Sequence, residues 1–212
     1  MNTANYFKVM LQMLQKIPQG EELLLHACCA PCATSVLEVL AAHFRVTLLC
    51  YNPNTWPREE YALRRSEMVR LPALTKSRYP VRFAELPYDE QEFLVPVRGL
   101  ECEPEGGVRC AVCFAVRLRC AAAYADAQGI PWFTTTLTVS PHKDATLINQ
   151  LGQEIAQKSR AHFLPSDFKK ADGYRRSIEL SAVYGIYRQD YCGCRFSVRD
   201  ASPKPQGARD PG

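Results

Sequence analysis

Residues 22–44 read "ELLLHACCAPCATSVLEVLAAHF" and predict a strand, a cysteine-rich turn and a helix in immediate succession. The apolar run "ELLLH" (22–26) is typical of a buried strand, whereas "TSVLEVLAAHF" (34–44) has apolar residues at helical spacing. Three cysteines lie between the two, within five residues. A strand that passes directly into a helix is the building unit of a parallel α/β sheet.

The same alternation continues along the chain. Further strands are predicted at 46–52, 81–88, 132–137 and 162–168, and further helices at 58–74, 109–129, 144–159 and 176–187, with at best a short helix at 90–97. Strands that alternate with helices predict an α/β fold, a parallel-sheet sandwich of about five strands with right-handed crossovers. In such sheets ligands bind beyond the carboxyl ends of the strands.

The two ends of the chain differ from this pattern. Residues 1–21 predict a short amphipathic helical extension, with Tyr6, Met10, Met13 and Ile17 at helical spacing. Residues 22–197 are expected to form a single α/β catalytic domain. The tail 198–212 is rich in Pro, Gly and charge and is predicted to be disordered.

Composition limits the classes of function. No stretch approaches the roughly 18 apolar residues of a membrane span, and the N-terminus lacks the features of a signal peptide. We therefore expect no membrane partner and a cytoplasmic location. The chain has ten cysteines, and in that compartment thiols are more often metal ligands or catalytic groups than disulfides. The net charge of +4 permits nucleic-acid binding through a local patch but does not require it.

Two cysteine groups indicate a metal. Cys28 and Cys29 follow the first strand, and "RCAVC" places Cys110 and Cys113 three apart at the start of a helix. Four thiolates suit either tetrahedral zinc or a [4Fe–4S] cluster, and the spacing does not choose between them. "CAPC", which ends at Cys32, is also the pattern of a thioredoxin-type redox site.

The remaining cysteines carry weaker signals. Cys192 and Cys194 in "DYCGCRF" are candidates for a redox-active disulfide, for metal binding or for a purely structural role. Cys50 and Cys120 are expected to be packed in the core. Cys102 lies in a polar loop and has no assignment.

Polar stretches beyond two strands add candidates for catalysis and substrate binding. Ser140, His142, Lys143 and Asp144 lie between a strand and a helix. Backbone N–H groups beside Lys143 would suit a phosphate. Ser140 and Asp144 are equally suited to be turn and cap residues.

Aromatic and basic residues suggest contact with unpaired RNA bases. A solvated charged helix is the alternative for Arg64 and Arg65. The candidates for RNA binding are Tyr51, Asn52, Trp56, Arg58, Lys169 and Arg175.

The chain lacks the G-x-x-x-x-G-K-[ST], G-x-G-x-x-G and S-G-G-x-D-S loops that bind nucleotides, so we expect no use of ATP.

Five motifs together resemble one known family. "LLLHACCAPC", "YNPNTWPREEY", "RCAVCFAVRL", "FTTTLTVSPHKDATLINQLG" and "YRQDYCGCRFS" are similar, in this order, to the QueH-type, cobalamin-independent epoxyqueuosine reductases. The resemblance covers residues 22 to about 197. It implies a fold similar to the adenine-nucleotide α-hydrolase-like (HUP) group, used without ATP.

The resemblance also implies an activity and its cofactors. The substrate would be epoxyqueuosine at the wobble position of the tRNA anticodon, reduced by two electrons to queuosine in the last step of its biosynthesis. Cys28, Cys29, Cys110 and Cys113 match the metal-binding cysteines of a [4Fe–4S] cluster with an additional mononuclear iron. Cys32, where relatives carry Cys or Asp, is a candidate ligand of that second iron, and Cys192 and Cys194 match the family's C-G-C. An external electron donor is required.

Three other classes remain as alternatives. A cluster-dependent tRNA sulfur-transferase should carry the S-G-G-x-D-S loop, and "HACCAPCAT" occupies that place. A thioredoxin-like oxidoreductase leaves Cys110, Cys113 and the C-G-C segment unexplained. A zinc-stabilised RNA-binding module has no need for the hydroxyl-rich "TTTLTVSPHK".

Overall fold

The computed structural model describes residues 4–197 and contains one five-stranded parallel sheet, as the alternating pattern predicts. The strand order is β3-β2-β1-β4-β5. The strands are β1 (Glu22–Ala27), β2 (Arg45–Cys50), β3 (Arg82–Glu85), β4 (Trp132–Thr135) and β5 (His162–Phe163). Within the described residues no helix is both long and apolar enough to cross a membrane.

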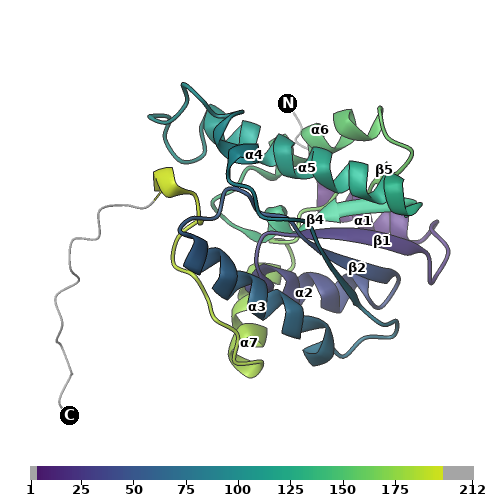
Figure 1. Ribbon diagram of the computed structural model, residues 1–212. Helices are drawn as coiled ribbons and strands as arrows, with labels where there is room; N and C mark the ends of the chain where they lie inside the picture. The colour runs from purple at the N-terminus through teal and green to yellow at the C-terminus, as the bar shows by residue number, and fades with distance from the viewer. Residues whose placement is uncertain (1–3, 198–212) are drawn as a thin grey trace, which may run out of the picture.

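Helices cover both faces of the sheet (Figure 1). In that view α5 and α6 lie above the sheet, and α2, α3 and α7 lie below it. The helices are α1 (Tyr6–Leu14), α2 (Ala30–Leu40), α3 (Arg58–Leu74), α4 (Gln91–Leu94), α5 (Val108–Gln128), α6 (Ala145–Ala156) and α7 (Gly173–Val183).

The central strand β1 is buried on both faces. Leu23 and Leu25 belong to the core between the sheet and α2, whereas Leu24 belongs to the core between the sheet and α5. All three are fully buried. A strand covered on both sides needs no polar face, which explains the continuous apolar run in the sequence. Each such leucine contributes about 2 kcal/mol by its burial.

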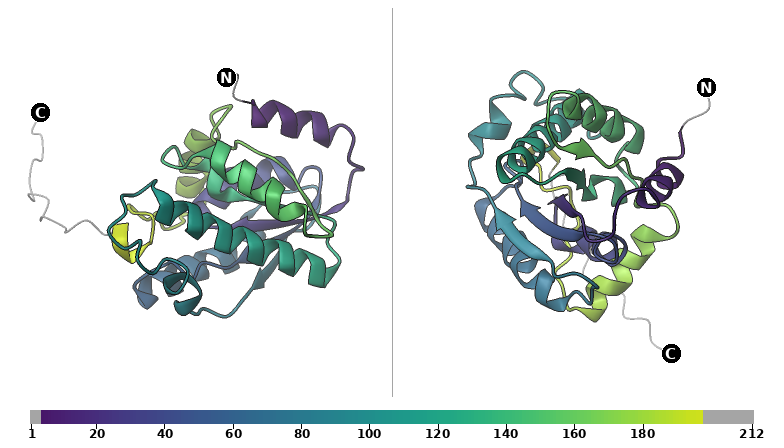
Figure 2. Two further views of the ribbon diagram at one scale, coloured as in Figure 1. Left: turned by 90° about the horizontal axis from the view of Figure 1, so that it is seen from above. Right: turned by 90° about the vertical axis from the view of Figure 1, so that its right-hand side faces the viewer.

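The N-terminal helix α1 packs at the side of this sandwich (Figure 2). Asn5 caps it by accepting a hydrogen bond from the backbone N–H of Lys8, and Met10 is fully buried in the core beneath α2. Ile17 is also buried but lies beyond the end of the helix. The division of the chain into an extension, a domain and a tail stays a prediction, and the tail 198–212 lies outside the described residues.

Several predicted boundaries were wrong. Helix α2 begins at Ala30 rather than at residue 34, because Pro31 suits the first helical turn and Cys29 precedes it in extended conformation. It ends at Leu40. Strand β5 has two residues. Leu164 still donates its N–H to the carbonyl of Phe133, but beyond it Asn149 donates to the carbonyl of Ser166 and accepts from its N–H, both at 2.8 Å. Helix α7 begins at Gly173 and ends at Val183, each earlier than predicted.

The strand order creates a natural binding crevice. From β1 the chain moves to β2 and β3 on one side of the sheet, and then returns to β4 and β5 on the other. The two directions separate between β1 and β4, and ligands of such sheets bind outside the carboxyl ends of the strands at this point. Cys28 follows β1 and Thr136 follows β4, so both lie at this crevice.

Candidate thiol-rich active site

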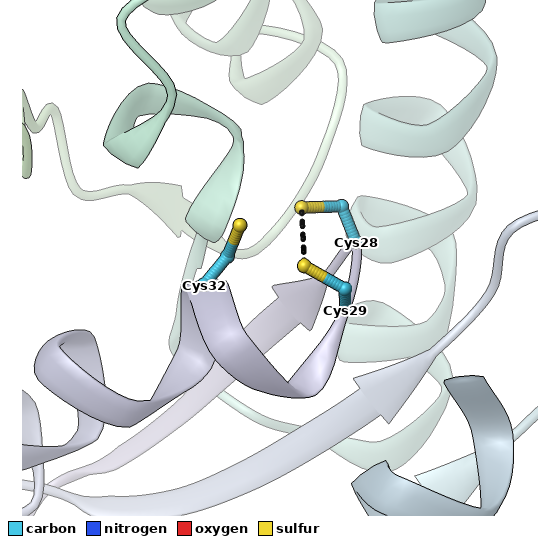
Figure 3. A group of neighbouring side chains, drawn as sticks. All are labelled: Cys28, Cys29 and Cys32. Atoms are coloured by element: carbon cyan, nitrogen blue, oxygen red, sulfur yellow. Dashed lines mark hydrogen bonds between the residues drawn. The ribbon is translucent and has the colours of Figure 1, made fainter. Parts of the chain in front are cut away.

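Three thiols converge at the end of β1. The sulfur atoms of Cys28, Cys29 and Cys32 all lie within 4.8 Å of one another, and those of Cys28 and Cys29 are 3.8 Å apart. Figure 3 shows Cys28 and Cys29 in the turn after β1 and Cys32 in the first turn of α2, with their sulfurs on a common side. In the described part of the chain this is the one group of three or more His, Cys, Asp or Glu side chains at metal-binding distance.

The backbone and one threonine hold this turn. The backbone N–H of Cys28 donates to Oγ1 of Thr136 at 3.0 Å, and the Thr136 hydroxyl donates to Sγ of Cys28 at 3.3 Å. Cys29 is the residue before α2, so the three sulfurs lie at the N-terminus of that helix. Negative charge is stabilised there by the helix dipole.

The three thiols differ in how readily they lose a proton. Hydrogen bonds from Cys29 and Cys32 hold the pKa of Cys28 well below its usual range, and the charge of Lys143 and a bond from Thr136 add to this. The same contact with Cys28 raises the pKa of Cys29 to about 12. Cys28 is therefore the thiol of the trio that ionises most readily, and a bound cation would favour ionisation of the other two as well.

Four further cysteines line one pocket beside the trio. They are contributed by the start of α5 and by the C-terminal segment: Cys110, Cys113, Cys192 and Cys194. Burial raises the pKa of Cys113 to about 12. Sγ of Cys110 accepts a hydrogen bond from the backbone N–H of Gly106 at 3.2 Å. All ten cysteines are free thiols.

The loop before Cys110 is held by a buried arginine. The guanidinium of Arg109 donates to the backbone carbonyls of Glu101 (2.7 Å) and Glu103, and it lies 5.3 Å from the ring of Phe196. Arg109 therefore ties residues 101–103 to the C-terminal segment that follows the C-G-C motif.

The C-G-C segment is docked on the loop after β2. The backbone N–H of Trp56 donates to the carbonyl of Gly193 at 2.8 Å, and Thr55 forms a β-bridge with Cys194. Arg64 donates to the carbonyls of Cys192 and Tyr191, at 3.1 and 3.3 Å. Arg64 is buried and bonded to Glu60, so its interpretation as part of a solvated charged face was wrong; Arg65 is partly exposed and pairs with Glu85.

Two cations connect the trio with the pocket. Burial opposes the charge of Arg117, but the nearby sulfurs of Cys113, Cys192 and Cys28 raise its pKa. Burial likewise opposes the charge of Lys143, and the sulfurs of Cys192, Cys28 and Cys32 raise its pKa. Both cations thus act on sulfurs of the trio and of the pocket. An all-sulfur donor set with nearby cations fits zinc or an iron–sulfur centre, and it does not fit magnesium or calcium.

The loop 140–144 serves first as a turn and cap. Oγ of Ser140 accepts from the backbone N–H of His142, and Asp144 accepts from the N–H groups of Thr146 and Leu147 at the start of α6. The turn-and-cap interpretation is confirmed, and a carboxylate at this helix start disfavours the alternative of a phosphate there. His142, Lys143 and Asp144 all line the pocket.

The candidate RNA-binding residues differ in exposure and in their partners. Trp56 and Arg58 are exposed, whereas Tyr51 and Asn52 are buried: Tyr51 donates to Glu92 at 2.6 Å and Asn52 to the carbonyl of Ala27 at 2.8 Å. Lys169 donates to the carbonyl of Lys143 at 3.1 Å, and Arg175 is exposed but pairs with Asp172 and Glu179.

The three remaining cysteines lie away from the pocket. Cys50 is buried in the core and Cys120 packs against the core beneath α5, as expected, while Cys102 is exposed. The sequence analysis did not identify Arg109, Arg117 and Thr136 as parts of the site. Two of these could have been found from the sequence, because Arg109 directly precedes Cys110 and Arg117 lies one helical turn after Cys113.

Known proteins are similar to this chain over most of its length. A family model described as "Epoxyqueuosine reductase QueH" matches residues 23–200. Proteins named epoxyqueuosine reductase QueH are 42% identical in Streptococcus pyogenes serotype M1, over 92% of this chain and 78% of the relative, and 34% identical in Thermotoga maritima, over 86% and 93%. One from Staphylococcus epidermidis is 40% identical, over 92% and 84%. The chain therefore belongs to the QueH family of epoxyqueuosine reductases.

Proposed function

We propose that the chain reduces epoxyqueuosine in tRNA to queuosine, a two-electron deoxygenation at the wobble position of the anticodon. The proposal is supported by the cysteines of this QueH family member: Cys28, Cys29 and Cys32 converge after β1, and four further cysteines line one pocket. The oxygen leaves as water, which takes up two electrons and two protons. An external donor supplies the electrons, and an enzyme of tRNA modification is expected in the cytoplasm.

We assign the cofactors to the same sulfurs. Cys28, Cys29, Cys110 and Cys113 would hold a [4Fe–4S] cluster, and Cys32 would bind an additional mononuclear iron. Cys192 and Cys194 would either complete the ligand set or store an electron pair as a dithiol. When bound, this group supplies electrons singly and a Lewis acid for the epoxide oxygen. Its support here is the all-sulfur donor set of the trio and the pocket.

The chain's own polar groups have separate roles. Lys143 and Asp144 line the pocket and His142 lies beside them, so these three are the candidates to hold or protonate the substrate. Trp56 is 38% exposed, and the guanidinium of Arg195 lies 5.4 Å from its ring centre. Because Trp56 also bonds to Gly193, it offers a fixed surface for stacking an unpaired base next to the C-G-C segment.

The function is tested in a bacterium that lacks its own epoxyqueuosine reductase. The chain and its variants are expressed there without oxygen, and the nucleosides of digested tRNA are measured by mass spectrometry. The wild type and Cys102→Ser, which changes an exposed thiol, should produce queuosine. Cys28→Ser and Cys110→Ala should leave the epoxide. Accumulation of the epoxide with the wild-type chain would refute the proposed reaction.

The cofactor is tested separately. Iron, acid-labile sulfide and zinc are measured per chain in protein prepared without oxygen. Roughly four sulfides with iron in excess of sulfide would support a [4Fe–4S] cluster and a further iron. About one zinc without sulfide, persisting after anaerobic reconstitution, would instead indicate a structural site and favour the RNA-binding module. Cys110→Ala with full iron loading and full turnover would refute the ligand assignment.

A further inference from the structure

Arg117 is a buried cation inside the sulfur-rich pocket. It lies in the middle of α5, one turn after Cys113, and is only 2% exposed. Its Nη2 donates to Sγ of Cys113 at 3.2 Å, its Nε donates to the carbonyl of Cys113 at 3.2 Å, and the guanidinium lies 5.7 Å from the ring of Phe114. The side chain is thus fixed on three sides.

No carboxylate within residues 4–197 forms an ion pair with Arg117. Buried Arg64, in contrast, is bonded to Glu60 at 2.7 Å. A permanent charge in the interior is strongly destabilising unless an opposite charge compensates it. The groups near Arg117 that can take a negative charge are the sulfurs of Cys113, which it contacts at 3.2 Å, and of Cys192 and Cys28, so the charge of Arg117 is matched only when these sulfurs are anionic.

Other roles for this charge do not fit its position. Arg117 is too deeply buried to reach a tRNA phosphate. It lies in the interior of a helix that runs from Val108 to Gln128, so it does not complement the negative C-terminal end of the helix dipole. The bond to the carbonyl of Cys113 needs only a neutral N–H donor, whereas the second bond of Arg117 goes to the sulfur of Cys113 and comes from a charged guanidinium.

We propose that Arg117 sets the reduction potential of the sulfur-bound centre by placing a fixed positive charge and one N–H bond at its Cys113 side. The inference rests on the proposed iron–sulfur function and deepens it. The potential of such a centre depends on its net charge, on hydrogen bonds to its sulfurs and on its exposure to solvent. Since reduction adds one electron and one negative charge without forming or breaking a bond, a fixed cation stabilises the reduced form and raises the potential.

The test is a mediated reductive titration of the reconstituted protein with dithionite, followed by electron paramagnetic resonance. Arg117→Gln removes the charge and should shift the ratio of reduced to oxidised centre at least tenfold toward the oxidised form, about 59 mV for a one-electron couple. Arg117→Lys keeps the charge and should stay within about threefold of the wild type. Arg119→Gln is the matched control, because Arg119 lies two residues along the same helix but is exposed.

Arg117→Met provides a second variant without the charge, since apolar replacement of a buried ion is often tolerated. The inference would be overturned if either neutral variant, fully loaded with iron and sulfide, kept its ratio of reduced to oxidised centre within about threefold of the wild type. An equal shift in Arg119→Gln would also overturn it. Wild-type protein that binds no iron and sulfide would instead refute the proposed cofactor, so the two failures are distinct.

Discussion

Gly193 separates the two cysteines of the C-G-C segment and adopts a φ of +100°, which glycine tolerates and other residues rarely adopt. A Cβ at this position would lie 2.7 Å from Nη1 of Arg64. Arg64 in turn holds the carbonyl of Cys192. The sequence identifies the C-G-C motif but not the role of Arg64 in positioning it, because the burial of Arg64 depends on a segment more than a hundred residues along the chain.

Gly193→Ala should therefore displace the segment that carries Cys192 and Cys194. We expect at least a tenfold loss of turnover, with the melting temperature lowered by only a few degrees. Gly185→Ala is the control, because Gly185 also has a positive φ (+58°) but has no atom within 4 Å of the added Cβ. Both variants incur backbone strain of order 1 kcal/mol. Equal turnover in the two variants would contradict this role of the Arg64 contact.

The elements themselves were largely predictable. Helix α3 matches its predicted span, and the apolar run of β1 predicts a strand covered on both faces. The error at β5 arose where a side chain replaces a backbone partner. Asn149 bonds to both backbone groups of Ser166, so the chain after Leu164 leaves the sheet despite its apolar sequence. A local sequence pattern does not reveal such a partner, because the partner lies in another element.

Asp126 joins the end of α5 to the turn before β5. Its Oδ1 accepts bonds at 2.9 Å from the hydroxyl of Ser159 and from the N–H groups of Arg160 and Ala161. Desolvation opposes ionisation, but together these bonds hold the pKa of Asp126 below its usual range. A lowered carboxyl pKa stabilises the fold above the pKa of the unfolded chain, and this stability is lost as the pH falls through the folded value.

We expect Asp126→Ala to lower the free energy of unfolding by about 1–2 kcal/mol at neutral pH, because three bonds are lost. Asp126→Asn keeps the oxygen but not its charge, so its smaller deficit should begin to shrink below the pKa of the unfolded carboxyl, about 4, and vanish below the lower pKa of the folded wild type. Urea unfolding at several pH values measures this. A deficit of Asp126→Asn that does not change with pH would contradict a contribution from the charge.

At the scale of the whole molecule, the site is assembled from segments that lie far apart in the sequence. The turn after β1, the loop after β2, the start of α5, the loop before α6 and the C-G-C segment all contribute. The strand–helix alternation predicts that motifs at strand ends will meet, and the cysteine motifs predict a thiol site. The pairing of Cys32 with Cys28 and Cys29, and the cations between the sulfurs, depend on three-dimensional packing that the sequence does not state.

The exposed face of this site should bind the anticodon loop through Trp56. Trp56→Ala removes a stacking surface worth about 1–3 kcal/mol for one base, so we expect KM for tRNA to rise at least about fivefold while kcat changes little. Val69→Ala, which truncates an exposed apolar residue of α3, is the control. Steady-state kinetics with the tRNA substrate separates the two parameters. An unchanged KM, or a loss confined to kcat, would argue against stacking.

The proposed reduction of epoxyqueuosine is tested by following the fate of the epoxide with purified protein. Reconstituted wild-type protein is incubated without oxygen with tRNA that carries epoxyqueuosine and with a chemical reductant, and the nucleosides are identified by mass. We expect loss of one oxygen from the modified base and accumulation of queuosine, dependent on the reductant and on Cys28. Protein with a full iron and sulfide content that leaves the epoxide unchanged would contradict it.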